Sequence, residues 1–241
     1  MAAYYDKEAG DKAVRWIETY CTHVKGELGG KPFILEDWQK DDIIRPLFGT
    51  LRSDGLRQYR QAYIEVPRKN GKSNLCAAIA LYMLFADGEP GAEIISAAGD
   101  RNQARIVFEI ASAMCANNAK LSGHGKVLRN SIHYKNSFYK AISAEANTKH
   151  GFNAHAVILD ELHVFPDRDL YDVLKTSTGA RTQPLVIAIT TAGHDTSSIC
   201  YELHEYAKKV REGSVEDDTF LPVIYSADKD DDWTQPATWS K

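Results

Sequence analysis

The chain has 241 residues, of which 44% are hydrophobic and 26% are charged, and its formal net charge is −4. These values are typical of one large folded domain, and the small negative charge excludes a protein coated with basic surface. No segment has the roughly 20 uncharged apolar residues that a membrane-spanning helix needs. Residues 1–6 lack the basic start of a signal peptide, so we expect a cytosolic protein without a membrane partner.

The cysteines are spread along the chain without a Cys-x-x-Cys pair, and the eight histidines show no metal-ligand spacing. This pattern predicts reduced, mostly buried thiols rather than disulfide bridges or a zinc site. The thiols belong to Cys21, Cys76, Cys115 and Cys200.

Residues 1–60 are predicted to form a helical lead-in. Apolar residues at helical spacing predict a helix over 7–25, and a glycine-rich segment ends it. A second helix is expected to begin within 33–39, just ahead of the candidate nucleotide site. Several ATPase families place a glutamine there to read the adenine edge, with an aromatic side chain against the base, and Gln39 and Trp38 are the candidates. The alternative is that Trp38 is a core residue and Gln39 a surface one.

A β-rich segment beginning at Ile64 leads into Gly-Lys-Ser at 71–73 and then into an apolar helix over 74–85. This order is typical of a phosphate-binding loop, in which backbone N–H groups hold a triphosphate, Lys72 reaches its β and γ oxygens, and the Ser73 hydroxyl ligates Mg²⁺. Val66 stands where the usual pattern has its first glycine, so the loop alone could also be a chance match. The residues expected to bind nucleotide here are Pro67, Arg68, Lys69, Asn70, Gly71, Lys72, Ser73 and Asn74.

Beyond this helix we expect a strand over 92–98 and a helix over 100–114 whose first turn is capped by Asp100. The segment 119–141 is rich in lysine and arginine, and we expect it to form a hairpin followed by a short strand over 139–143. Because the whole chain is acidic, any nucleic-acid contact must come from such a local patch or from a ring of subunits. A solvated basic face is the alternative. The candidate nucleic-acid contacts are Lys126, Arg129 and Lys135.

The apolar run at 156–159 ends abruptly in Asp160 and Glu161, as a buried parallel strand does. At the carboxyl end of such a strand Asp160 would hold Mg²⁺, and Glu161 would polarise a water for attack on the γ-phosphate. A strand that ends in two carboxylates can also be a solvated turn. Its position downstream of the Gly-Lys-Ser loop, however, is the one that a nucleotide hydrolase requires.

A further buried strand is predicted over 184–191, followed by a helix over 197–212. Strands that alternate with helices predict an α/β fold with a mostly parallel sheet, helices on both faces, and ligands at the carboxyl ends of the strands. The inserted strand and the glutamate indicate a P-loop NTPase of the additional-strand, catalytic-glutamate type. Thr190 and Thr191 are candidates for coupling γ-phosphate loss to the next helix, and an ordinary β-branched strand end is the alternative. We expect the ATPase core at 61–213 and a lid or linker at 214–241.

With these motifs, the chain resembles the ATPase domain of the large terminase subunit of tailed bacteriophages. The resemblance runs from about Trp16 to Trp239 and rests on four motifs in order, at 66–73, 96–104, 149–163 and 190–193. It implies a DNA-packaging motor that uses ATP and Mg²⁺. It also implies double-stranded DNA, portal protein and small terminase subunit as partners, a homo-oligomeric ring that we expect to be a pentamer, and a place in the host cytoplasm on the viral procapsid.

The resemblance also assigns roles to single residues. Arg68 would be a loop arginine near the γ-phosphate, and the roles given above to the Gly-Lys-Ser loop, the two carboxylates and the threonines are the family's. Some relatives carry a trans-acting arginine where this chain has His150. Lys149 is therefore our first candidate for that group, with Arg129 and Arg101 in reserve. Family members continue into a nuclease domain, so we expect a longer protein that is also an endonuclease.

Two other functions stay open at this stage. A DExH-type helicase lobe fits the Asp-Glu-Leu-His run at 160–163 and the glutamine ahead of the loop, although such helicases need a second lobe. A nucleotide-gated structural module would bind ATP to order a ring without turning it over.

Overall fold

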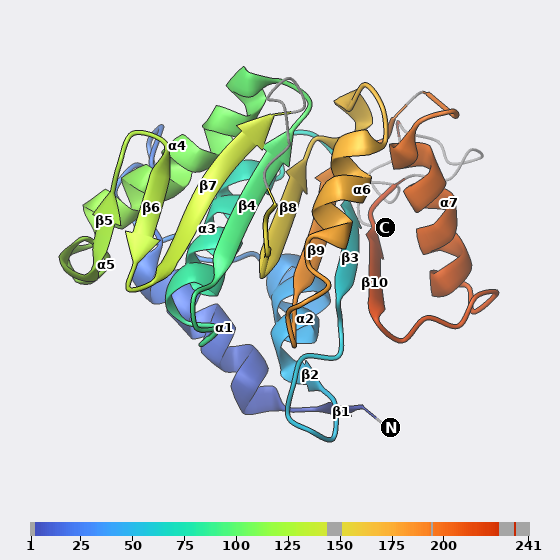
Figure 1. The fold of residues 1–241 in the computed structure, drawn as a ribbon, viewed down its shortest axis with the longest axis horizontal. Coiled ribbons are helices and arrows are strands. Elements are labelled where there is room, and N and C mark those ends of the chain that lie inside the picture. The colour runs from blue at the N-terminus through green and yellow to red at the C-terminus, as the bar shows by residue number, and fades with distance from the viewer. Residues whose placement is uncertain (1–2, 144–150, 194, 227–233, 235–241) are drawn as a thin grey trace.

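The computed structural model describes residues 3–143, 151–193, 195–226 and 234, and in this part of the chain the main sheet has eight strands in the order β10-β3-β9-β8-β4-β7-β6-β5. From β10 to β7 neighbouring strands are parallel, and β6 and β5 add an antiparallel hairpin at one edge (Figure 1). A short antiparallel pair joins β1 (Tyr4–Tyr5) to β2 (Thr50–Leu51). The main strands are β3 (Gln61–Glu65), β4 (Glu93–Ala98), β5 (Gly125–Val127), β6 (Ser131–Tyr134), β7 (Ser137–Ser143), β8 (Ala156–Asp160), β9 (Leu185–Thr190) and β10 (Phe220–Ile224).

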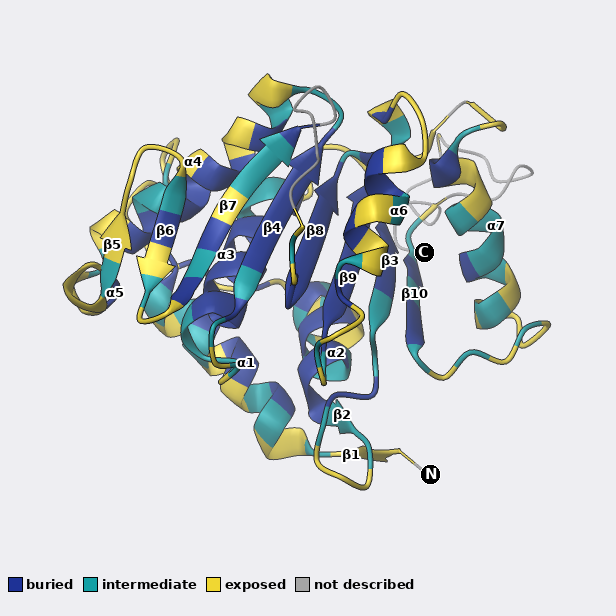
Figure 2. Cartoon of the chain, in the orientation of Figure 1, coloured by how far each residue is buried: buried dark blue, intermediate teal, exposed yellow. Residues whose placement is uncertain are grey.

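Helices cover both faces of the sheet, as predicted. The face with α1 to α4 and the face with α6 and α7 each bury one set of alternating strand residues (Figures 1 and 2). In β8, Ala156 and Ile158 face the first set, whereas Val157 and Leu159 face the second, because successive side chains of a strand point to opposite faces. The helices are α1 (Lys7–Tyr20), η1 (Gln39–Ile44), α2 (Arg45–Gly49), α3 (Lys72–Phe85), α4 (Arg101–Asn117), α5 (Ala119–His124), η2 (Leu162–Val164), α6 (Asp169–Thr176) and α7 (Ile199–Arg211).

The sheet order confirms the predicted class of P-loop fold. β9 lies between β3, which leads into the phosphate loop, and β8, which ends in the two carboxylates. Helix α3 is buried nearly all round because it lies between the sheet and the helices α1 and α4. Asp100 caps α4 as predicted, since its side chain accepts hydrogen bonds from the N–H groups of Asn102 and Gln103.

Some predicted boundaries and elements were wrong. The first helix ends at Tyr20 rather than at residue 25. Residues 220–224 were assigned to a lid or linker, but they form β10, which pairs in parallel with β3 and belongs to the sheet. The helix ahead of the loop, in contrast, begins within 33–39 as predicted, at Asp37, and continues as the six-residue π-helix η1, after which the N–H of Arg45 donates to the carbonyl of Lys40.

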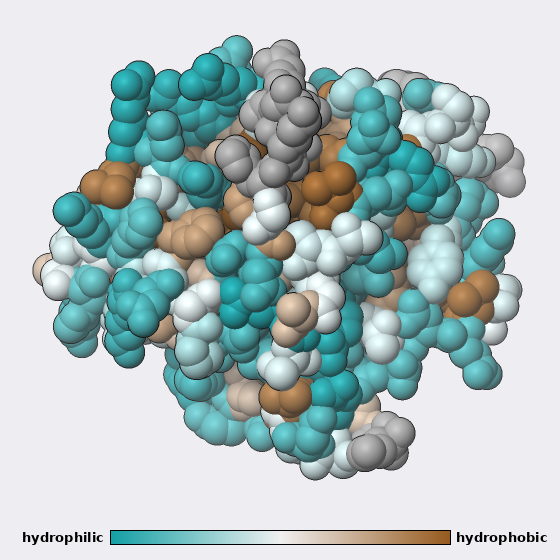
Figure 3. Space-filling view, viewed as in Figure 1, coloured by the Kyte–Doolittle hydropathy of each residue, from teal (hydrophilic) through white to brown (hydrophobic). Residues whose placement is uncertain are grey.

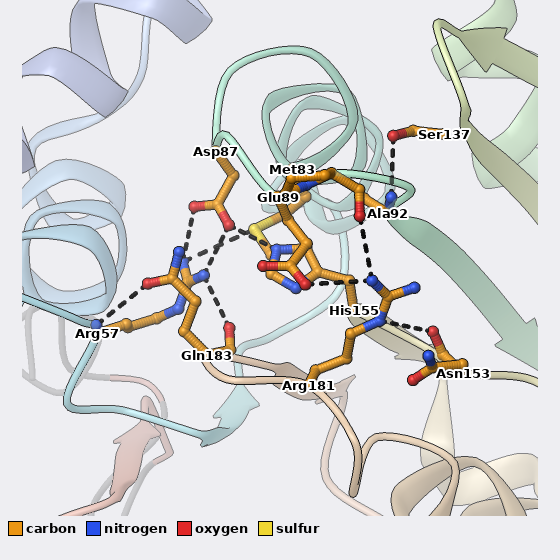
Figure 4. Close-up of polar contacts among 11 residues, drawn as sticks. Arg57, Met83, Asp87, Glu89, Ala92, Ser137, Asn153, His155, Arg181 and Gln183 are labelled. Atoms are coloured by element: carbon orange, nitrogen blue, oxygen red, sulfur yellow. Dashed lines mark hydrogen bonds and ion pairs between the residues drawn. The ribbon is translucent and has the colours of Figure 1, made fainter.

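The amino ends of the strands are joined by a buried polar cluster (Figure 4). The guanidinium of Arg57 donates to both carboxylate oxygens of Asp87, at 3.1 and 2.8 Å, and Nε2 of His155 lies 2.6 Å from Oδ2 of Asp87. Burial alone would raise the pKa of Asp87, but the charge of Arg57 and the hydrogen bond from His155 outweigh burial and lower that pKa. The cluster links four segments that are far apart in sequence, because Arg57 also donates to the carbonyl of Gln183 at 3.1 Å.

All four cysteines are free and buried, which confirms the prediction for the thiols. Among the described residues, no helix is both long and apolar enough to cross a bilayer. The face seen in Figure 3 is mostly hydrophilic, with hydrophobic residues in small separate groups.

Candidate nucleotide site

The loop between β3 and α3 has the backbone of an anion-binding turn. Lys69 and Gly71 both have positive φ angles, of 69° and 72°, and Gly71 is the residue at which α3 begins. Gly71, as the N-cap residue, has no side chain to cap the first turn of α3, so the N–H groups and the positive end of the helix are available to phosphate oxygens. The side chain of Asn70 closes the loop by donating to the carbonyl of Pro67 at 3.1 Å. Val66, which stands where the usual pattern has its first glycine, is buried directly after β3, and the loop has this geometry without that glycine.

Lys72 lies at the centre of the site. Its side chain is only 6% exposed, and Nζ is 3.4 Å from the carbonyl oxygen of Pro67 and 3.8 Å from Oε1 of Glu161. A lysine that is this buried requires anionic or polar partners. The loop therefore presents one cation toward the carboxylates at the end of β8.

Asp160 is buried at the end of β8, and its Oδ1 has no hydrogen-bond partner among the residues that the structure describes. Burial, and then the neighbouring charge of Glu161, raise the pKa of Asp160 to about 7. A buried carboxylate oxygen without a partner fits a divalent cation, which would supply the missing charge. Among the described residues no three His, Cys, Asp or Glu side chains gather around one point, so such a cation would need a hydroxyl such as that of Ser73, together with water and substrate oxygens, as its other ligands.

Glu161 has a strained backbone. Its φ and ψ angles of 51° and 52° are left-handed, which is uncommon for a residue with a side chain and occurs often at functional sites. The carboxylate is a quarter exposed, with Oε1 facing Lys72 and Oε2 3.3 Å from Nδ1 of His163. The turn after β8 thus aims a fixed carboxylate into the site.

A cavity of about 380 Å³ lies in front of the loop. It brings together seven of the residues predicted from the sequence: Arg68, Lys69, Gly71, Lys72, Ser73, Asn74 and Glu161. Four other lining residues were not predicted: Val24 and Lys25 follow α1, and Ile106 and Ile110 belong to α4. These four residues line the cavity because α1 and α4 pack against α3, and the sequence alone does not predict that packing. A wider groove of about 800 Å³ between α6 and α7 contains none of the predicted site residues.

Neither Gln39 nor Trp38 lines this cavity, although Gln39 lies beside the loop at Gly71. Gln39 is only 3% exposed, so the alternative that it is a surface residue is wrong. Its Oε1 accepts the N–H of Glu36 at 3.0 Å, and a side chain at Gly71 would begin 3.6 Å from its Nε2. Trp38 packs edge-on against Tyr225, with ring centroids 5.5 Å apart. The role of both residues at the adenine stays a prediction.

Both candidate coupling threonines are buried at the end of β9. The hydroxyl of Thr190 donates to the carbonyl of Thr191 at 2.9 Å and accepts the backbone N–H of His163 at 3.2 Å. Oγ1 of Thr190 is also 3.8 Å from Sγ of Cys200 in α7. Thr190 therefore touches both the turn that follows the carboxylates and the next helix.

The candidate nucleic-acid residues are exposed on β5 and in the turns on either side of β6, at the edge of the sheet away from the phosphate loop. Arg129 and Lys135 lie in the turns at opposite ends of β6, a strand of four residues that spans about 13 Å, and Lys126 lies on β5. Lys149 and His150 are outside the described residues. Arg101 is exposed at the first residue of α4.

Comparison with known proteins agrees with this geometry. Residues 37–209 match the family model of the terminase large subunit, ATPase domain. The chain is 32% identical over 240 residues to the terminase large subunit of Enterobacteria phage HK97, which covers 95% of this chain and 45% of that protein. It is also 38% identical over 91 residues to protein YmfN of Escherichia coli K12, which covers 38% of this chain and 20% of that protein.

Solved structures of large terminases are also similar to this chain. The crystal structure of the HK97 bacteriophage large terminase superposes with a TM-score of 0.81 at 28% identity, over 95% of this chain and 46% of that one. The ATPase domain of the Thermus phage P74-26 large terminase, at 20% identity and a TM-score of 0.51 over 61% of this chain and 65% of that one, shares the fold. The chain spans less than half the length of its HK97 relative. The expected endonuclease activity is not borne out by these matches.

Proposed function

The chain belongs to the ATPase domains of terminase large subunits, and from this premise we propose that it hydrolyses ATP to drive double-stranded DNA into a procapsid. The observation that carries the proposal is the convergence of Lys72, Ser73 and Glu161 on one cavity, with Asp160 buried beside them. A helicase lobe or a non-hydrolysing module would not be expected to match the family model of the terminase ATPase domain over residues 37–209.

Each group has a distinct part in the proposed reaction. Lys72 and the N–H groups at the start of α3 bind the β- and γ-phosphates. Glu161 orients the attacking water and accepts its proton, and its fixed turn holds the carboxylate toward the cavity. Arg68, which also lines the cavity, faces the region where charge develops on the γ-phosphate.

Ser73 and Asp160 are the residues that would hold Mg²⁺. When bound, the cation supplies positive charge that neutralises the phosphate oxygens. The buried, unpartnered Oδ1 of Asp160 is the feature of this chain that supports the assignment.

Completion of the site by a neighbouring subunit is part of the proposal. Lys149 is the first candidate for the trans-acting cation, and Arg101 and Arg129 are the reserves. We place Trp38 and Gln39 at the adenine, and Thr190 and Thr191 between the γ-phosphate and α7. The remaining proposed features are a ring of identical subunits, a pentamer in our account, with the portal protein and the small terminase subunit as partners, docked on a procapsid in the host cytoplasm.

Double-stranded DNA is the proposed polymer substrate, and the exposed hairpin with Lys126, Arg129 and Lys135 is its proposed contact. The hairpin is a separate edge of the sheet, so a duplex there would not block the cavity at the loop. Lysine and arginine side chains in such a patch bind phosphate without regard to base sequence.

The test is ATP turnover per subunit over a wide range of protein concentration, with and without duplex DNA. A motor completed in trans should show a specific rate that rises with concentration and rises again with DNA. The missing trans cation should reduce the rate of an isolated subunit by about 10³-fold. A rate per subunit that is independent of concentration and of DNA would contradict the proposal.

A further inference from the structure

We propose that His163 is a positioning residue for the carboxylate of Glu161, through an imidazole that is hydrogen-bonded to the hydroxyl of Thr190 and holds its Nδ1 beside that carboxylate. The inference rests on the proposed ATPase function. It adds a residue that neither the phosphate-loop motif nor the carboxylate motif requires.

The distances place His163 between the two groups. Its Nδ1 is 3.0 Å from Oγ1 of Thr190 and 3.3 Å from Oε2 of Glu161. The backbone N–H of His163 donates to the same Oγ1 at 3.2 Å. One imidazole nitrogen therefore lies within reach of the carboxylate that ends β8 and of the hydroxyl that ends β9.

The turn that carries His163 is held from both sides. A Cβ at Gly99 would lie 2.7 Å from the carbonyl oxygen of Val164, so the loop between β4 and α4 packs directly on η2. A Cβ at Gly193 would lie 3.2 Å from Cβ of His163, so the segment after β9 closes over the histidine. With so little free space, the imidazole has few alternative positions.

Two independent arguments place the proton on Nδ1. The hydroxyl hydrogen of Thr190 is directed at the carbonyl of Thr191, at 2.9 Å, so Oγ1 can only accept from the imidazole. An ionised carboxylate can also only accept, and a lone pair on Nδ1 would be repelled by Oε2 of Glu161. The structure therefore favours the Nδ1–H tautomer, with the hydrogen bonded to Oγ1 of Thr190 and Oε2 of Glu161 beside it at 3.3 Å from Nδ1.

This arrangement separates the two oxygens of Glu161. Oε2 is directed at His163, whereas Oε1 points to Lys72 and the cavity. Anchoring one oxygen leaves the other in a fixed position, where a water can be held for attack. Because the same imidazole nitrogen is bonded to Thr190, movement of the carboxylate would also be transmitted to β9, and from Thr190 to Cys200 of α7.

The first test compares His163→Ala with His163→Asn. Misplacing a catalytic group commonly costs on the order of 10²-fold in rate, so the alanine variant should lose about that factor in kcat while KM for ATP changes by less than about threefold. The asparagine amide can donate from nearly the same place, so His163→Asn should recover about tenfold of the loss. The matched control is His204→Ala, which removes a similarly exposed imidazole that bonds Glu65 at 2.9 Å, and which should keep kcat within about threefold.

The second test does not depend on turnover. Nitrogen-15 NMR of the histidine-labelled chain should show His163 as the Nδ1–H tautomer, and Glu161→Gln or Thr190→Val should shift its Nδ1 resonance. The Nε2–H tautomer, or turnover in His163→Ala within threefold of the unmodified chain, would overturn the inference. Absence of turnover in the unmodified chain would instead overturn the proposed function, and the NMR result would then show whether Nδ1–H of His163 still lies between Thr190 and Glu161.

Discussion

Nζ of Lys72 lies 3.8 Å from Oε1 of Glu161, so the cation of the phosphate loop faces the carboxylate at the end of β8 across one cavity. A triphosphate placed on the loop would compete with Glu161 for the ammonium group, because phosphate oxygens are strong partners for lysine. Substrate binding and release of the carboxylate are therefore linked by this pair. Replacement of Lys72 is nevertheless expected to weaken ATP binding, whereas replacement of Glu161 is expected to slow hydrolysis.

Gln39→Ala should raise KM for ATP by about tenfold, because the loss of the amide beside Gly71 removes the group that we place at the base. The matched control is Gln58→Ala. Gln58 is equally buried and donates to the carbonyl of Asp218 at 2.9 Å, on a segment that does not line the nucleotide cavity. Each variant should lose about 1–2 kcal/mol of stability through an unpaired backbone group, which thermal unfolding can check. Equal KM values for ATP in the two variants would show that Gln39 does not contact the adenine base.

Replacement of Lys126 and Lys135 by alanine should abolish most of the stimulation of ATP turnover by duplex DNA, while turnover without DNA stays unchanged. The salt dependence of DNA binding should also weaken, by about one unit in the log–log slope for each lost phosphate contact. The control is Lys12→Ala with Arg15→Ala, which removes the same charges from the exposed side of α1. An equal loss of stimulation in both double variants would mean that only net charge matters, and that the hairpin is a solvated basic face.

Asp87→Asn should lower the free energy of unfolding by about 3–5 kcal/mol, because it leaves the guanidinium of Arg57 buried without its carboxylate. Chemical denaturation measures this loss directly. Asp172→Asn is the control, since it makes the same chemical change in an exposed pair with Arg168 and should cost less than about 1 kcal/mol. Similar losses in the two variants would show that the cluster in Figure 4 is not a major source of stability.

The same cluster predicts a dependence of stability on pH. The pKa of Asp87 is lower in the folded chain than its unfolded value of about 3.9, so the folded state binds its proton less readily. The stabilisation is therefore complete above about pH 4 and is lost as the pH falls below that value. The difference in unfolding free energy between the unmodified chain and Asp87→Asn should shrink from pH 5 toward pH 2. A constant difference over that range would contradict the lowered pKa.

The sequence was sufficient to predict those helices and strands whose apolar residues form a continuous run or a regular pattern. The strands β4, β8 and β9 and the helix α3 were predicted within a few residues, because buried strands and a loop followed by an apolar helix have distinct patterns. The carboxylates at 160–161 and the lysine at 72 could be paired because parallel strands bring their carboxyl ends together.

Other features depend on contacts that a local pattern does not contain. Strand β10 was missed because Pro222 interrupts its short apolar run, and a proline is compatible with a strand only at a sheet edge, a strand start or a bulge, which the local sequence does not establish. The walls that Lys25 and Ile106 add to the cavity, and the pairing of Arg57 with Asp87, arise when segments far apart in sequence pack together. The position of His163 also required the structure, since its partner Thr190 lies 27 residues away.

The most direct measurement compares equilibrium ATP binding with single-turnover hydrolysis in Glu161→Gln and Lys72→Ala. The account predicts that Glu161→Gln binds ATP within about threefold of the unmodified chain but hydrolyses it at least 10²-fold more slowly. Lys72→Ala should lose binding by tenfold or more, since a cation at the phosphates is removed. Hydrolysis at the normal rate by Glu161→Gln would contradict the central claim that this carboxylate, held at the end of β8, activates the water.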